Sequence, residues 1–171
     1  VLRAAFAAHA DPTRAVAMQA YMKSALPFYG IAAPLRRKLT RAAATAQLAS
    51  DTAALARAMR TLWREARYRE ERYAAIELPR SGRAHSKLVN LELLPVLTEM
   101  ISSGAWWDFC DDISGNTLAT LLARHPREMK PLAAVRMIDL SMPTRTVPRR
   151  PPSMGTPMSI ISRSLPPRAS R

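Results

Sequence analysis

A series of helix-start signals, recurring along most of the chain, is the feature that most constrains the fold. Asp11 precedes a proline, Ser50 or Asp51 precedes an apolar stripe, and Pro34 and Pro126 each open a further helical pattern. A small polar cap before periodic apolar residues, or a proline in the first turn, marks the start of a helix. The chain therefore reads as a succession of short helices with defined starts.

Apolar residues recur at helical spacing inside these segments, as Leu91, Leu94, Leu97 and Ile101 do. No segment shows sustained strand alternation, and only five of the 171 residues are glycine. The body is predicted to be all-α, with helices of about 12–18 residues joined by short turns, which is typical of stacked antiparallel helix pairs. Trp63 lies on the apolar stripe of its helix and is predicted to be a core residue. An irregular globular bundle is the alternative topology.

The positive charge of the chain is spread over its body as well as its end. The formal net charge is +13, and residues 1–135 hold 19 Lys and Arg against 12 Asp and Glu, a net +7. A basic body favours a polyanionic partner such as nucleic acid, although a merely soluble cationic protein would have the same composition. Arg36 and Arg37 begin a cationic stretch in the first turns of the helix opened by Pro34, against the helix dipole. A bound phosphate would favour that arrangement, so both are candidate phosphate contacts, with a solvated face as the alternative.

The character of the chain changes near residue 136. Half of the 14 prolines lie in residues 142–171, which contain no aromatic residue and almost no apolar periodicity. Such a segment cannot repay the entropy of ordering, so we predict a helical domain over residues 1–138 and a disordered basic tail over 139–171. One interpretation of the tail is an arm that follows DNA phosphates. The other, which we favour, is translation in a shifted reading frame.

Cysteine and histidine usage bounds the possible chemistry. The single Cys110 excludes an internal disulfide framework and fits a reducing compartment, so we expect a cytoplasmic protein associated with the nucleoid. The three histidines are scattered without the spacing of a zinc site, so no metal and no cofactor are expected. No run is long enough to cross a membrane, and we expect a monomer.

The most distinctive motif runs from Trp106 to Asp112, where two adjacent tryptophans precede three acids. Trp107 and Asp111 are four residues apart and share one face of a helix. An aromatic surface beside a carboxylate suits a ligand that carries positive charge or develops it during a reaction. Trp106 is assigned to packing. Asp108 and Asp112 lie about 100° from the pair and are interpreted as solvated or capping acids.

Four elements together resemble the AlkD-type DNA alkylation repair glycosylases. They are Tyr21-Met22-Lys23; Gly30-Ile31 followed by Pro34-Leu35-Arg36-Arg37; Leu62-Trp63 before a helix containing Tyr73-Ala74-Ala75; and Trp106-Trp107-Asp108 with Asp111, continuing to Arg124-His125-Pro126. The order and spacing of these elements cover about residues 2–135.

The resemblance implies a curved HEAT-like α-α superhelix whose concave basic face holds double-stranded DNA. It implies removal of cationic purines alkylated at N3 or N7, with Trp107 and Asp111 as the catalytic pair. Tyr21 would line the same cleft, and Lys23 in the same element is a further DNA-binding candidate. The family's later helix pairs, which supply a cleft arginine and a second tryptophan, have no counterpart in residues 136–171. We therefore expect impaired activity. The alternatives are a non-catalytic helical-repeat DNA-binding protein and a protein-interaction scaffold.

Overall fold

The computed structural model describes residues 1–130, and every regular element in that part of the chain is helical. The predicted all-α class is confirmed. The elements are α1 (Leu2–Ala8), α2 (Pro12–Met22), α3 (Ala33–Ala46), α4 (Thr52–Arg64), α5 (Arg69–Glu77), η1 (Leu78–Arg80), α6 (Arg83–Lys87), η2 (Leu91–Leu93), α7 (Leu94–Gly104), α8 (Trp107–Asp112), the π-helical turn η3 (Ile113–Leu118) and α9 (Ala119–Arg124). The predicted tail and the domain boundary at residue 138 lie outside the described residues.

The helix starts follow the local signals of the sequence. The Asp11 side chain accepts a hydrogen bond from the Arg14 N–H at 3.0 Å, and Pro12 is the first residue of α2. Between the two candidate caps of α4, the structure selects Asp51, which accepts from the Ala54 N–H at 2.7 Å. Each cap satisfies a main-chain donor that has no partner within its own helix. These starts are therefore fixed locally.

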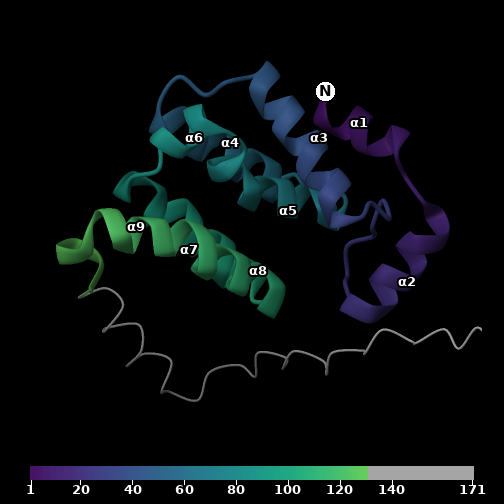
Figure 1. Ribbon diagram of the computed structural model, residues 1–171. Coiled ribbons are helices and arrows are strands. Elements are labelled where there is room, and N and C mark those ends of the chain that lie inside the picture. Colours follow the sequence, from purple (N-terminus) through teal and green to yellow (C-terminus); the bar gives the residue numbers. More distant parts are fainter. Residues whose placement is uncertain (131–171) are drawn as a thin grey trace, which may run out of the picture.

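Successive helices form pairs that stack on one another. α4 packs against α5, and α7 packs against α8, each pair being joined by a short connection. Contacts of α4 with α7 and of α5 with α8 lay one pair on the next. α3 precedes them beside α5, so that α3, α5 and α8 succeed one another from top to bottom in Figure 1. This arrangement is the stacked helix-pair architecture expected from the sequence.

The main core lies between these pairs. Trp63, predicted to be a core residue, is 2% exposed and packs edge-on against Phe109 with ring centroids 5.1 Å apart. Gly104 makes this contact possible, because a Cβ there would lie 2.9 Å from the Trp63 ring. A second, smaller cluster joins Phe6, Tyr29, Ile31 and Ala74. The main cluster therefore connects the helix pair that carries Trp63 to the start of α8.

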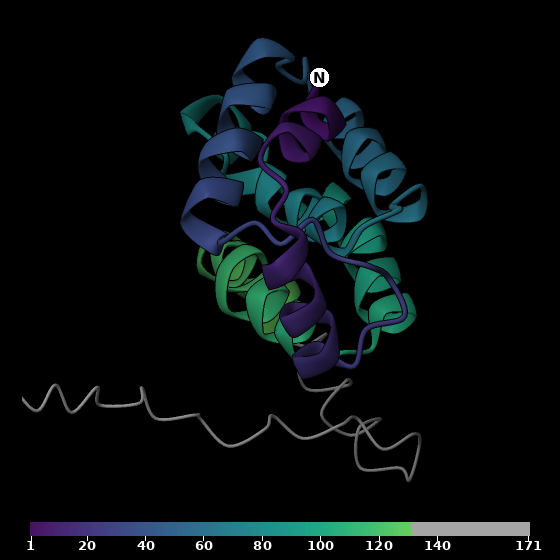
Figure 2. The ribbon, with the colours of Figure 1, turned by 90° about the vertical axis from the view of Figure 1, so that its right-hand side faces the viewer.

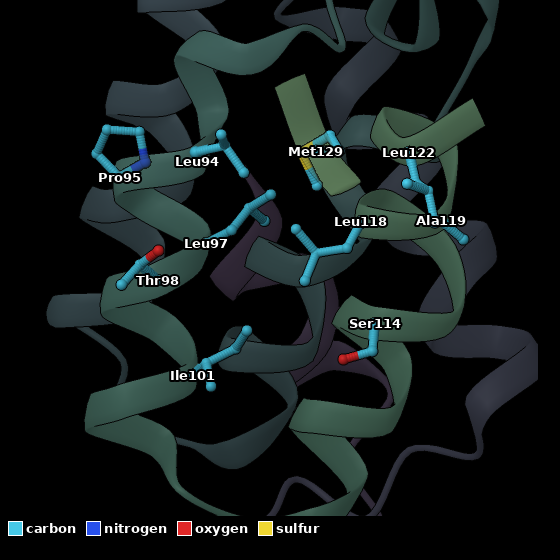
Figure 3. A pocket seen from close by; sticks show the side chains of 10 residues that line it. All are labelled: Leu94, Pro95, Leu97, Thr98, Ile101, Ser114, Leu118, Ala119, Leu122 and Met129. Atoms are coloured by element: carbon cyan, nitrogen blue, oxygen red, sulfur yellow. The ribbon is translucent and has the colours of Figure 1, made fainter. Parts of the chain in front are cut away.

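An apolar groove of about 560 Å³ runs between α7 and the helical stretch formed by η3 and α9 (Figure 3). Leu94, Leu97 and Ile101 line one wall, and Leu118 and Leu122 line the other. Thr98 and Ser114 are its polar lining residues, and none of the lining residues is charged. Such a groove does not suit a cationic or phosphate-bearing ligand. Within residues 1–130, no helix combines the length and apolarity needed to cross a bilayer.

Candidate functional site

The α8 helix carries Trp107 and Asp111, four residues apart, on one face. The Asp111 side chain is exposed and forms no hydrogen bond or ion pair with any of residues 1–130, while Trp107 on the same face is partly buried. The predicted aromatic–carboxylate face is therefore present, with its carboxylate open to solvent. Burial raises the pKa of the adjacent Cys110 thiol, with Asp111 adding to the shift, so this cysteine is a poor nucleophile.

Asp108 and Asp112 occupy the other face of α8, where both are ion-paired. Asp108 accepts a hydrogen bond from Arg69 at 2.8 Å, and Tyr73 donates its hydroxyl to the same carboxylate. Asp112 accepts two hydrogen bonds from Arg80, at 2.5 and 2.7 Å. The expectation that these acids are solvated was wrong, because their cationic partners come from a segment more than 30 residues earlier in the chain. Asp108 also accepts a hydrogen bond from the Phe109 main-chain N–H at 2.9 Å, as a capping acid does.

The Tyr73 hydroxyl acts as a hydrogen-bond donor to Asp108. Burial raises the pKa of its hydroxyl above the ordinary value, and the negative charge of Asp108 raises it further. The hydroxyl therefore stays protonated and donates to Asp108, while its oxygen accepts a hydrogen bond from Arg69 at 3.0 Å. Sequence reasoning missed Arg69, Tyr73 and Arg80. For Arg69, the available signal was its charge in a helix, α5, whose uncharged residues are largely alanine and isoleucine. A charged side chain on an inward face requires a partner.

Tyr21 and Lys23 lie at the end of α2, close to this network. Tyr21 is 47% exposed, and Lys23 is an exposed residue in the left-handed conformation with φ of 47°. One residue later, the Ser24 hydroxyl accepts a hydrogen bond from Arg69 at 3.3 Å. Figures 1 and 2 both place this end of α2 towards α8. Arg69 thus contacts both the turn after Tyr21 and the acid next to Trp107.

The two arginines predicted to contact phosphate have different environments. Arg36 is 7% exposed, donates to Glu77 at 2.7 Å and stacks over the Tyr73 ring at 4.3 Å. This placement does not agree with a phosphate contact, because the guanidinium already serves as an internal counter-ion. Arg37 is exposed and lies 3.6 Å from Glu77, with exposed Lys38 beside it. The cationic surface of α3 therefore begins at Arg37.

Buried carboxylates fix the segment that joins α2 to α3. Glu70 is fully buried and accepts hydrogen bonds from the main-chain N–H groups of Tyr29, Gly30 and Ile31 at 3.0, 2.9 and 3.2 Å. Gly30 has φ of +85°, and a Cβ there would lie 2.1 Å from the Asp11 carbonyl oxygen. Glu70 therefore holds residues 29–31, which lead from α2 into α3, against α5. No group of His, Cys, Asp and Glu among residues 1–130 is arranged to hold a metal ion.

Comparison with known proteins agrees with this geometry. A family model described as "DNA alkylation repair enzyme" matches residues 2–136, which is most of the chain. The search of curated proteins found no match. The match includes α3, α5 and α8, which carry the cationic surface and the aromatic–carboxylate face. The chain therefore belongs to the DNA alkylation repair enzyme family, and DNA alkylation repair is its general function.

Proposed function

We propose that the protein is a DNA glycosylase that hydrolyses the N-glycosidic bond of purines alkylated at N3 or N7 in double-stranded DNA. The observation that carries the proposal is the contrast among the three acids of α8. Asp108 and Asp112 are paired with arginines, whereas Asp111 is exposed and unpaired within the described residues, beside Trp107. A carboxylate in that position is available to a substrate.

The chemistry of the lesion matches a lone carboxylate. Alkylation at N3 or N7 makes the purine cationic, so its bond to C1′ is weakened before any protein group acts. The C1′–N bond breaks with its electron pair going to the base, which leaves as a neutral purine without protonation. The sugar becomes an oxocarbenium-like cation, and a water molecule then forms the new C1′–O bond and loses a proton.

Asp111 and Trp107 have separate roles in this scheme. The Asp111 carboxylate stabilises the developing positive charge on the sugar, positions the attacking water and accepts its proton. The Trp107 ring supplies an aromatic surface for the cationic base or sugar, worth about 0.5–2 kcal/mol. Tyr21 lines the cleft from the end of α2. Lys23 and Arg37 contact backbone phosphates, which position the duplex without reading its sequence.

The experiment is base release from a duplex that contains N7-methylguanine. We expect release by the full chain and a fall of about 10²–10³-fold in kcat for Asp111→Asn, the cost of removing one group that stabilises transition-state charge. Glu92→Gln is the matched control, because Glu92 is an exposed acid on η2 outside the α8 face. Equal rates for Asp111→Asn and the parent protein would exclude the catalytic assignment.

A non-catalytic DNA-binding function is the second candidate, and the exposed cationic stretch on α3 favours it. It predicts salt-sensitive binding to duplex DNA without base release. Absence of both binding and release would leave the protein-interaction scaffold as the remaining hypothesis.

A further inference from the structure

The two paired acids of α8 are held by one preceding segment of the chain. Asp108 contacts Arg69 in the first turn of α5, and Asp112 contacts Arg80 at the end of η1, which directly continues α5. Because Asp108 and Asp112 are four residues apart, they lie within about 40° of each other on the helix surface. The segment α5–η1 therefore holds a single face of α8 at two points, one helical turn apart.

Holding that face determines where the neighbouring face points. Trp107 and Asp111 each precede a paired acid by one residue, so their face is rotated by about 100° from the paired one. Rotation of α8 about its axis would move Trp107 and Asp111 together and would break both ion pairs. The rotation that exposes Asp111 is therefore the one that the Asp108 and Asp112 pairs permit.

Arg69 is itself a fixed reference point. It is 6% exposed, and its guanidinium donates to Asp108, Tyr73 and Ser24. The same group lies 4.3 Å from the centroid of the Phe109 ring, and the Arg69 main-chain N–H donates to the Pro27 carbonyl at 2.9 Å. A guanidinium held on several sides leaves its carboxylate partner little freedom. Movement of Asp108 would disturb the whole cluster.

The π-helical turn η3 begins immediately after Asp112 and reconciles this rotation with core packing. Buried residues follow one another at four-residue intervals: Phe109, Ile113, Thr117 and Leu121 are 1, 0, 4 and 0% exposed. In a regular α-helix each interval of four would advance by about 40°, so that Leu121 would lie about 120° away from Phe109. A π-helical turn is wider than an α-helical one and removes this drift. The side chain of Asn116 donates to the carbonyl and the carboxylate of Asp112, joining the two parts.

The geometry points to a positioning device: the pairs Arg69–Asp108 and Arg80–Asp112, together with the π-helical turn, set the rotation of α8 that presents Trp107 and Asp111 to DNA. Arg69, Arg80, Asp108 and Asp112 are positioning residues, since they act through Trp107 and Asp111. This inference rests on the proposed function only for its effect on rate. The effect on the orientation of α8 does not depend on that function.

Orientation can be measured without a reaction. In the full chain with Cys110→Ala, nitroxide labels at Lys38→Cys and Asp111→Cys report the distance between α3 and the exposed face of α8 by electron spin resonance. Both labelled positions are exposed, and Arg80 and Asp112 are only partly buried, so the variants should fold. We expect a narrow distance distribution, and a shifted or broader one after Arg80→Gln or Asp112→Asn. An unchanged distribution would overturn the inference.

The matched control is Glu99→Gln. Glu99 on α7 pairs with Arg60 and Arg64 on α4, at 3.0 and 2.5 Å, and it is 26% exposed against 21% for Asp112. This substitution also removes ion pairs between helices, but neither of them involves α8. It should leave the label distances unchanged.

Kinetics separate positioning from general stability. On the unlabelled protein, Asp112→Asn should lower kcat by about 100-fold while KM and duplex affinity stay close to parent values, because misplacement by about 1 Å can cost that much. Glu99→Gln should leave kcat unchanged. A parent-like kcat in a variant whose labels have moved would overturn the positioning role. Absence of base release in the parent protein, with the label shifts as expected, would instead reject the proposed function and retain the orientation of α8.

Discussion

Replacing Glu70 with glutamine should weaken the fold far more than the loss of one charge on a surface would. The Glu70 oxygens accept three main-chain hydrogen bonds, Oε1 from Gly30 and Ile31 and Oε2 from Tyr29. A glutamine side chain has one oxygen and one NH₂ group, so at least one buried N–H then faces another donor. If the oxygen keeps Gly30 and Ile31, the N–H of Tyr29 loses its acceptor.

The expected loss follows from those three bonds. One unsatisfied buried N–H costs about 1–3 kcal/mol, and each remaining bond weakens by roughly 1 kcal/mol when its acceptor changes from charged to neutral. Relief from burying the carboxylate charge offsets part of this sum. We expect Glu70→Gln to lower the free energy of unfolding by about 3 kcal/mol, a large fraction of the stability of about 5–15 kcal/mol typical of a domain.

Urea unfolding followed by circular dichroism measures this difference, with Glu92→Gln as the control, expected to lie within about 0.5 kcal/mol of the parent. Hydrogen exchange adds a local readout, because the amides of residues 29–31 should lose protection before those of α4 do. A loss below about 1 kcal/mol in Glu70→Gln would refute the reasoning, since that is no more than an average substitution costs. It would mean that the three N–H groups had found other acceptors.

Three further predictions concern pH, salt and chain length. Burial lowers the pKa of His85 below its unfolded value of 6.5, so the unfolded state binds the proton more tightly than the folded state does. The free energy of unfolding should therefore fall as pH drops below about 6.5. A pH series of urea melts should show a shallower fall in His85→Asn than in the parent protein. Arg37→Gln should reduce the slope of log affinity for duplex DNA against log salt concentration by about 0.9. Arg57→Gln on α4, which is also exposed, should leave that slope unchanged. Equal slopes for Arg37→Gln and the parent protein would exclude the Arg37 phosphate contact. We propose that residues 136–171 are translated in a shifted reading frame. A chain with the other frame restored after codon 135 should then release N7-methylguanine at least about 10²-fold faster, the usual effect of one charge-stabilising group, and equal rates would contradict the proposal.

The parts of the fold that depend on neighbouring residues were predictable from the sequence. The cap at Asp11, the helix start at Ser50 or Asp51, the core position of Trp63 and the all-α class follow from signals a few residues long. The shared face of Trp107 and Asp111 follows in the same way from helical spacing. Their catalytic role stays a prediction.

The partners of the charged residues were not predictable, because they are set by packing between distant segments. Arg36 was predicted to be a surface cation, but it is buried beside Glu77. Glu77 is 41 residues away in sequence, so local patterns gave no sign of this partner. Asp108 and Asp112 likewise pair with arginines that are distant in sequence. The π-helical turn could not be predicted from its own residues. It lies where the ion pairs of α8 and the core contacts of α9 require different rotations of the helix.

The π-helical turn accommodates one residue more between Phe109 and Leu121 than about three turns of regular α-helix would hold. Gly115 is exposed, and a Cβ there would meet no atom within 4 Å, so this position does not depend on packing against its neighbours. Deletion of Gly115 would convert the turn to regular α-helix and leave Phe109 and Leu121, then eleven residues apart, within about 20° of each other. Insertion of one residue would instead rotate Leu121 by about 100° away from that face. Among residues 113–118, a deletion at the exposed Gly115 should therefore be tolerated better than an insertion, whereas the buried Ile113 and Thr117 should accept few substitutions.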